Sequence, residues 1–190
     1  MRKIIIITFI LSGFQTYSQN YPYAESEKNP YGLPNPNAPK EITDYKEMIG
    51  KCYCKSVTRI DQNTWADTVL MTWEFKYIMN GYAVQDITYK EDGAHSGSIR
   101  QYNADSSRWY VHYYSSKAAP ATLPAWGGTR VGNRIVLYRK QPAPNKTPGY
   151  YRLTFYDLSD KGFNWLGEWV DISETFSYPT WKIFCRRKME

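Results

Sequence analysis

The side chain with the most distinctive chemistry is Asp86, a carboxylate within the aromatic segment Asp67 to Lys90. Asn80-Gly81 separates two alternating runs of this segment, and Asn-Gly favours the positive φ angles of a tight hairpin turn. Counting outward from the turn pairs Phe75 with Asp86, so the carboxylate is expected among apolar neighbours on one face of the hairpin. The functional residues expected on this face are Trp73, Phe75, Tyr77, Asp86 and Thr88.

A carboxylate in such surroundings suits either of two kinds of chemistry. It can orient the polar end of a bound molecule, or it can act as a general acid or base. Glycoside hydrolysis uses two carboxyl groups about 5–10 Å apart, and alternation places Glu74 and Glu168 on the opposite face from Asp86. We therefore assign no catalytic residue and keep a hydrolase that uses Asp86 as an alternative.

The three cysteines, Cys52, Cys54 and Cys185, lie near the two ends of the expected folded region. The first and last strands of an up-and-down barrel are neighbours, so Cys185 could form a disulfide with Cys54 or with Cys52. Cys54 and Cys185 are the candidate pair, and reduced core cysteines are the alternative. Cys-x-Cys without a nearby histidine predicts no metal site, and His95 and His112 are expected at the surface or rim.

Aromatic residues are unusually frequent, with 18 Tyr and 7 Trp among 190 residues. Large aromatics pack wide β-sheets, and they also line ligand cavities, so both interpretations stay open.

The net charge is +6, and the basic residues are scattered apart from Arg186 to Lys188. A nucleic-acid-binding protein concentrates such residues in a patch, so we expect no nucleic-acid partner.

The N-terminal part of the chain divides into a leader and an arm. Residues 1–18 have the basic, apolar and small-residue order of a secretory signal peptide, which predicts an exported protein, periplasmic or extracellular, that does not span the membrane. Residues 19–40 are rich in Pro and Tyr, which predicts an extended arm able to contact a protein partner. The folded domain is expected at 41–188, beginning with a short helix at Asp44 to Ile49.

Ten short strand patterns fill the rest of the chain and predict an all-β, closed, antiparallel up-and-down barrel; a β-sandwich is the alternative. The expected strands are 51–60, 66–79, 82–91, 94–102, 108–115, 123–131, 133–140, 149–157, 162–170 and 180–188. Odd-numbered positions are the more apolar in most strands, so we place them inside the barrel.

A tight turn at Asp92-Gly93 would put Asp86 opposite Ile99, which places Gln101 inside and Arg100 outside. The expected interior then combines aromatic walls with a few polar groups. The walls are Trp73, Phe75, Tyr77, Trp109, Tyr113, Trp165 and Trp169, and the polar groups are Asp86, Thr88 and Gln101.

Several motifs resemble a bacterial family of calycin-like barrels whose label is a domain of unknown function. They are EITDYKEMIGKCYC, TWEFKYIMNGYAVQDITY, IRQYNADSSRWYVHYY, GNRIVLY and FNWLGEW, within residues 41–188. The resemblance implies a closed barrel related in shape to lipocalins, fatty-acid-binding proteins and nitrobindins, and it implies no activity. Cys52 stands where the common calycin opening has Trp. Haem binding by analogy with nitrobindins needs a proximal histidine on the last strands, which this chain lacks, so we expect no cofactor.

These observations predict an exported, lipocalin-like barrel that binds a small apolar or amphipathic molecule in an aromatic interior. The main alternative is a filled barrel without enzymatic activity that acts through residues 20–40. The hydrolase that uses Asp86 is the second alternative.

Overall fold

The computed structural model describes residues 21–188. The predicted signal peptide, residues 1–18, lies outside the described residues. No helix within residues 21–188 is long and apolar enough to cross a membrane.

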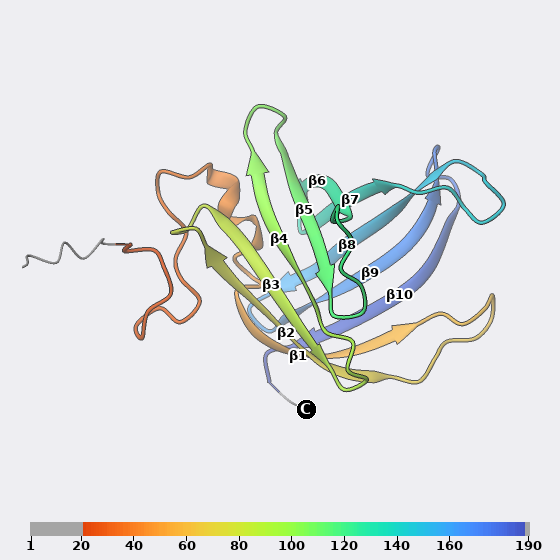
Figure 1. Cartoon of the computed structure of the whole chain (residues 1–190), viewed down its shortest axis with the longest axis horizontal. Helices are drawn as coiled ribbons and strands as arrows, with labels where there is room; N and C mark the ends of the chain where they lie inside the picture. Colours follow the sequence, from red (N-terminus) through yellow and green to blue (C-terminus); the bar gives the residue numbers. More distant parts are fainter. Residues whose placement is uncertain (1–20, 189–190) are drawn as a thin grey trace, which may run out of the picture.

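The described chain forms one closed antiparallel barrel of ten strands, as the alternating pattern predicts (Figure 1). Each strand pairs with its neighbours in sequence, and β1 pairs with β10 to close the sheet. The β-sandwich alternative is therefore wrong. The strands are β1 (Gly50–Thr58), β2 (Val69–Ile78), β3 (Ala83–Lys90), β4 (Ser96–Asn103), β5 (Arg108–Ser115), β6 (Ala125–Val131), β7 (Arg134–Lys140), β8 (Gly149–Ser159), β9 (Gly162–Asp171) and β10 (Ser177–Arg186).

The β2–β3 hairpin has the predicted register. Tyr77 lies opposite Val84, Phe75 opposite Asp86 and Trp73 opposite Thr88. Met79, Asn80 and Gly81 all adopt positive φ in the turn, a conformation that Asn and Gly tolerate better than most residues. Asp86 consequently faces the barrel interior and is only 2% exposed.

The β3–β4 register differs from the prediction by one residue, because five residues (91–95) connect the two strands. The Asp92 side chain accepts a hydrogen bond from the Ala94 amide, and the His95 amide donates to Ser116. This longer connection places Asp86 opposite Ser98 rather than Ile99. A one-residue shift reverses the two faces of a strand, so the predicted positions of Arg100 and Gln101 are both wrong: Arg100 faces inward and Gln101 outward.

The end of the barrel beside the β2–β3 turn is plugged by the 3₁₀-helix η1 (Lys40–Tyr45) and the turn that follows it. The helix therefore begins and ends earlier than predicted. The Tyr45 ring contacts Trp109 edge-on with 4.8 Å between ring centroids, and the Trp109 indole donates to Asp44 over 2.9 Å. Ile42, Tyr45 and Met48 are all buried in the core.

Residues 21–39 of the Pro/Tyr-rich segment form no helix or strand, and they pack against the barrel rather than extending away from it. Figure 1 shows it beside the β2–β3 turn. The Asn35 amide donates to Gly81 O over 3.1 Å, the Tyr77 amide donates to Tyr31 O over 2.9 Å, and the Asn35 side chain donates to Asn80 O over 3.0 Å. Residues 21–39 therefore form part of the plugged end.

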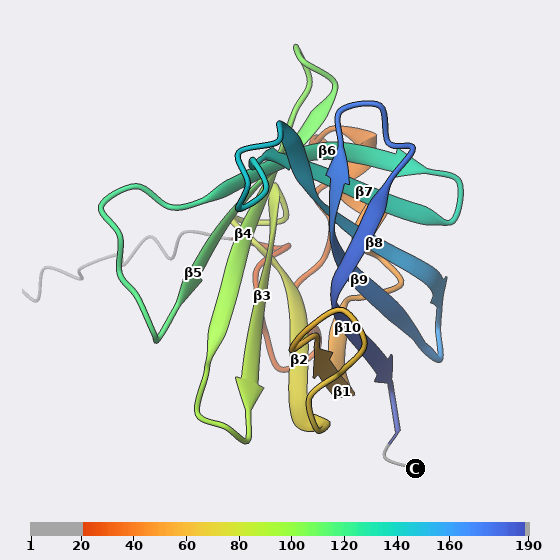
Figure 2. The ribbon, with the colours of Figure 1, turned by 90° about the vertical axis from the view of Figure 1, so that its right-hand side faces the viewer.

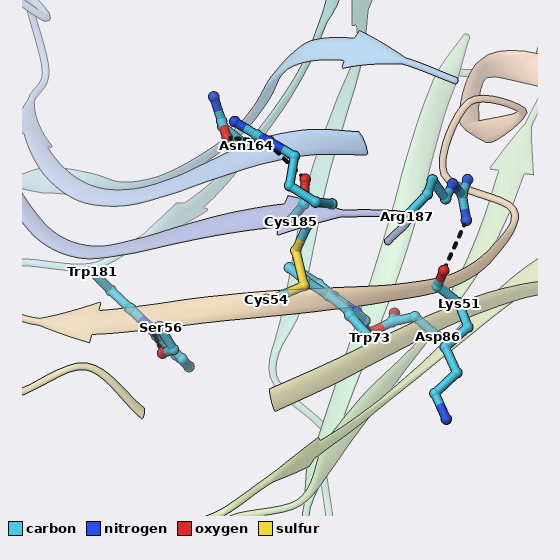
Figure 3. The surroundings of a disulfide bond; sticks show 10 residues. Lys51, Cys54, Ser56, Trp73, Asp86, Asn164, Trp181, Cys185 and Arg187 are labelled. Atoms are coloured by element: carbon cyan, nitrogen blue, oxygen red, sulfur yellow. Dashed lines mark hydrogen bonds between the residues drawn. A yellow bond between two sulfur atoms is a disulfide. The ribbon is translucent and has the colours of Figure 1, made fainter. Parts of the chain in front are cut away.

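A disulfide between Cys54 and Cys185 joins the first and last strands, which confirms the candidate pair (Figure 3). The two residues lie directly opposite each other in the β1–β10 ladder. Cys52 is a free, buried thiol, and burial raises its pKa. The bond fixes the barrel closure covalently.

Candidate functional site

A cavity of about 210 Å³ lies inside the barrel. Its walls combine residues from β2 through β10, so it exists only because the sheet closes; Figure 2 shows these strands surrounding the interior. Aromatic rings dominate the lining, together with aliphatic side chains and a few polar groups. The lining residues are Met71, Trp73, Asp86, Thr88, Ser96, Ser98, Arg100, Val111, Tyr113, Trp126, Leu137, Tyr151, Leu153, Phe155, Trp165, Trp181 and Ile183.

The polar groups of the cavity lie on one wall, formed by β3 and β4. Asp86 and Thr88 face inward from β3, and Ser96, Ser98 and Arg100 face inward from β4. The Thr88 hydroxyl is 2.7 Å from the Ser96 hydroxyl. The remaining strands supply mostly rings and aliphatic groups, so the cavity has a polar side and an aromatic side.

The Asp86 carboxylate is the negatively charged group of the polar wall. One carboxylate oxygen accepts a hydrogen bond from the Trp73 indole N–H over 2.6 Å, and the other accepts one from the Arg100 guanidinium. Figure 3 shows Asp86 directed toward the Trp73 ring beside the disulfide. Asp86 and Arg100 are both only 2% exposed. Because a buried carboxylate requires partners, this arrangement explains how Asp86 is stable there.

Arg100 separates the cavity from the plugged end of the barrel. Its guanidinium lies over the rings of Phe75, Tyr45 and Phe155, at 4.9, 5.2 and 5.8 Å from their centroids. Burial raises the pKa of Tyr45 to about 12, so this phenol is neutral at ordinary pH. Arginine suits the position because its planar cation stacks on rings while donating to a carboxylate.

The rim lies at the end opposite η1, where two cations rest on aromatic rings. Lys90 Nζ is 5.5 Å from the Trp181 ring centroid and forms an ion pair with Asp92. Arg139 Cζ is 5.2 Å from the Trp126 ring centroid, and the Arg139 side chain is exposed. The cavity thus opens between the rings of Trp126 and Trp181, and a cation lies over each of these two rings.

Five of the predicted ligand-binding residues line the cavity: Trp73, Asp86, Thr88, Tyr113 and Trp165. Phe75, Tyr77 and Trp109 lie instead in the packed core of the plugged half. Trp169 is half-buried and donates to Gln141 O. Gln101 is exposed and lies 3.9 Å from the Met79 sulfur, which follows from the corrected β4 register.

The prediction missed Arg100, Ser96, Ser98 and Trp126 as interior residues. Asp86 itself was the available signal for Arg100, since a buried carboxylate needs a donor and Arg100 is a cation on the neighbouring strand. Trp126 is an even-numbered position on β6 and therefore falls outside the rule that odd positions face inward. On β6, the ladder pairs Trp126 with the inward-facing Val111.

The cavity lining given above holds Asp86 as its single carboxylate. Glu168 faces away from the barrel interior, where it is buried and pairs with Arg152 over 3.0 Å. Within residues 21–188, no three His, Cys, Asp or Glu side chains are grouped so that they could hold a metal ion.

The chain matches no protein-family model, and no curated protein matches it in sequence. The barrel, the disulfide and the geometry of the cavity are therefore the features that bear on function.

Proposed function

We propose that this protein binds a small amphipathic molecule inside its barrel. The observation that carries the proposal is the cavity itself, in which aromatic rings face a wall of buried polar groups. Small-molecule sites commonly combine an apolar lining with a few fixed polar groups. An apolar cavity of about 150 Å³ in another protein holds benzene, so about 210 Å³ suits a single substituted ring or a short chain.

Three further features support an exported carrier of the calycin type. The Cys54–Cys185 disulfide suits an oxidising compartment. The closed up-and-down barrel is the architecture that the resemblance to calycin-like proteins implies. The sequence of residues 1–18 has the pattern of an export signal.

The other two functions suggested by the sequence have weaker support. Both oxygens of Asp86 already accept hydrogen bonds, from Trp73 and Arg100, which leaves the carboxylate poorly suited to proton transfer. Residues 21–39 pack on the barrel through Asn35 and Tyr31, so the arm has a structural role that needs no partner protein.

The proposal is tested by titrating the protein with a panel of single-ring and short-chain compounds, using tryptophan fluorescence and calorimetry. Trp73, Trp126, Trp165 and Trp181 line the cavity, so a bound compound should change the emission. The panel is repeated with Ser98→Leu, which places a larger side chain in the cavity, and with Thr154→Leu on the outer face of β8. We expect Ser98→Leu to weaken binding at least tenfold and Thr154→Leu to leave it unchanged. Absence of any response from the unmodified protein would overturn the proposal.

A further inference from the structure

We infer that the polar end of the bound molecule is an uncharged hydrogen-bond acceptor, such as a carbonyl oxygen, rather than a carboxylate. This inference rests on the proposed function and names the class of ligand. It follows from the charge balance of the cavity and from the hydrogen-bond donors that the protein leaves unused.

The two charged groups of the cavity lining cancel each other. Asp86 and Arg100 form a buried ion pair, and the other fifteen lining residues are uncharged. A carboxylate entering this space would add a third charge with no cation left to compensate it. Burying an uncompensated charge is far more costly than burying a hydrogen-bonded neutral group, so the interior selects against an ionised ligand.

The cavity also offers donors that have no partner inside the described chain. They include the Trp126 indole N–H, which is buried, together with the Ser98 hydroxyl, the Tyr113 hydroxyl and the Trp165 indole N–H. None of these four groups forms a hydrogen bond with another residue among 21–188. Ser98 and Trp165 are each 6% exposed. Buried polar groups are normally hydrogen-bonded, and an acceptor on the ligand would satisfy them.

The position of Ser98 makes it the donor that best reports on the ligand. Ser98 lies opposite Asp86 on β3 and opposite Tyr113 on β5, so two unused hydroxyls are neighbours across the β4–β5 ladder. Trp165 belongs to the aromatic side, with its ring 6.4 Å from Trp73 and 5.2 Å from Trp181. A ring in the cavity would contact this aromatic side while its acceptor faces Ser98 and Tyr113.

A competing arrangement would place an anion at the rim. Arg139 lies over Trp126 there and forms no ion pair with a carboxylate among the described residues. Its exposure to solvent weakens any such attraction, because charge interactions at the surface are screened by water and salt. Comparing a neutral ligand with an anionic one distinguishes the two arrangements directly.

The test uses three probes of similar size, ethylbenzene, acetophenone and benzoate, titrated into the unmodified protein at pH 7. We expect acetophenone to bind at least tenfold more tightly than benzoate, and about three- to tenfold more tightly than ethylbenzene because of its hydrogen bond. Tightest binding by benzoate would overturn the inference while leaving the proposed function intact. Equal binding of acetophenone and ethylbenzene would also overturn it. No binding by any probe would overturn the inference and count against the proposed function.

Two variants locate the interaction. Ser98→Ala should weaken acetophenone binding about three- to tenfold and leave ethylbenzene binding unchanged, whereas Thr154→Ala on the outer face of β8 should change neither. Arg139→Gln should leave acetophenone binding unchanged. Loss of acetophenone binding in Arg139→Gln, with retention in Ser98→Ala, would contradict the inference and place the polar end at the rim.

Discussion

The Asp86 carboxylate on β3 accepts a hydrogen bond from the Arg100 guanidinium on β4, and both side chains are buried at the inner end of the cavity. The pair lies between the packed half of the barrel interior and the half that contains the cavity. On one side of it lie the packed rings of Tyr45 and Phe75, and on the other lies the space proposed to hold a ligand.

Removing one member of this pair should destabilise the protein strongly. Asp86→Leu leaves the Arg100 charge buried without a carboxylate, and breaking a buried pair in this way costs about 3–5 kcal/mol. Replacing both members, Asp86→Leu with Arg100→Met, should cost less than Asp86→Leu alone. Urea unfolding measures these free energies, with Glu74→Ala on the outer face of β2 as a control expected within about 0.5 kcal/mol of the unmodified protein. A double variant less stable than the Asp86→Leu protein would contradict this account.

The Cys54–Cys185 disulfide should contribute substantially to stability, because it closes a loop with a sequence separation of 131 residues. Loop-closure entropy predicts an effect of up to about 5 kcal/mol. Cys54→Ser with Cys185→Ser should therefore lower the urea midpoint markedly and make it insensitive to reductant. Cys52→Ala should keep the reductant sensitivity, since Cys52 is outside the bond.

Thiol titration without reductant should find one thiol per chain in denaturant and none in the native protein. A second reactive thiol would contradict the pairing.

The contact between Glu47 and Arg130 should make the plugged end sensitive to acid. Burial disfavours the charged form of Glu47, but it is outweighed by the hydrogen bonds from Arg130 and a backbone amide together with the positive charges of Arg130 and Lys46, so the pKa of Glu47 lies below its ordinary value of 4.5. Because the pKa is lower in the folded state, the contact stabilises the protein above pH 4.5 and this stabilisation is lost as the pH falls through the folded-state pKa. Unfolding of the unmodified protein and Glu47→Gln across pH 3–7 should give a difference in stability that narrows on acidification. A constant difference would show that the pair has no such role.

The docked arm should depend on the buried side chain of Asn35. Asn35→Ala removes the hydrogen bond to Asn80 O and leaves that carbonyl short of a donor, at a cost of about 1–3 kcal/mol. Hydrogen exchange at residues 21–39 should accelerate in this variant and remain unchanged in Asn37→Ala, an exposed neighbour in the same segment. Ligand binding should be the same in both proteins. Unchanged exchange in Asn35→Ala would show that other contacts hold the arm.

Local sequence signals predicted the strands and the first hairpin correctly, because Asn80-Gly81 and the alternation around it act over short distances. They placed Arg100 wrongly because the connection at 91–95 is longer than a tight turn. In this connection the His95 amide donates a hydrogen bond to the hydroxyl of Ser116, a residue distant in sequence, and local signals do not reveal such a contact. The docking of the arm was missed for a similar reason. Its backbone hydrogen bonds go to Gly81 and Tyr77, partners that proline content alone does not reveal.

The seven tryptophans provide the most direct test of the central claim that the cavity holds a ligand. Trp73, Trp126, Trp165 and Trp181 line the cavity, whereas Trp65, Trp109 and Trp169 do not. Indole N–H signals should be followed by NMR while acetophenone is added to ¹⁵N-labelled protein. The account predicts saturable shifts for the four cavity tryptophans and unchanged signals for the other three. Shifts confined to Trp65, Trp109 or Trp169, or no saturable shift at all, would contradict it.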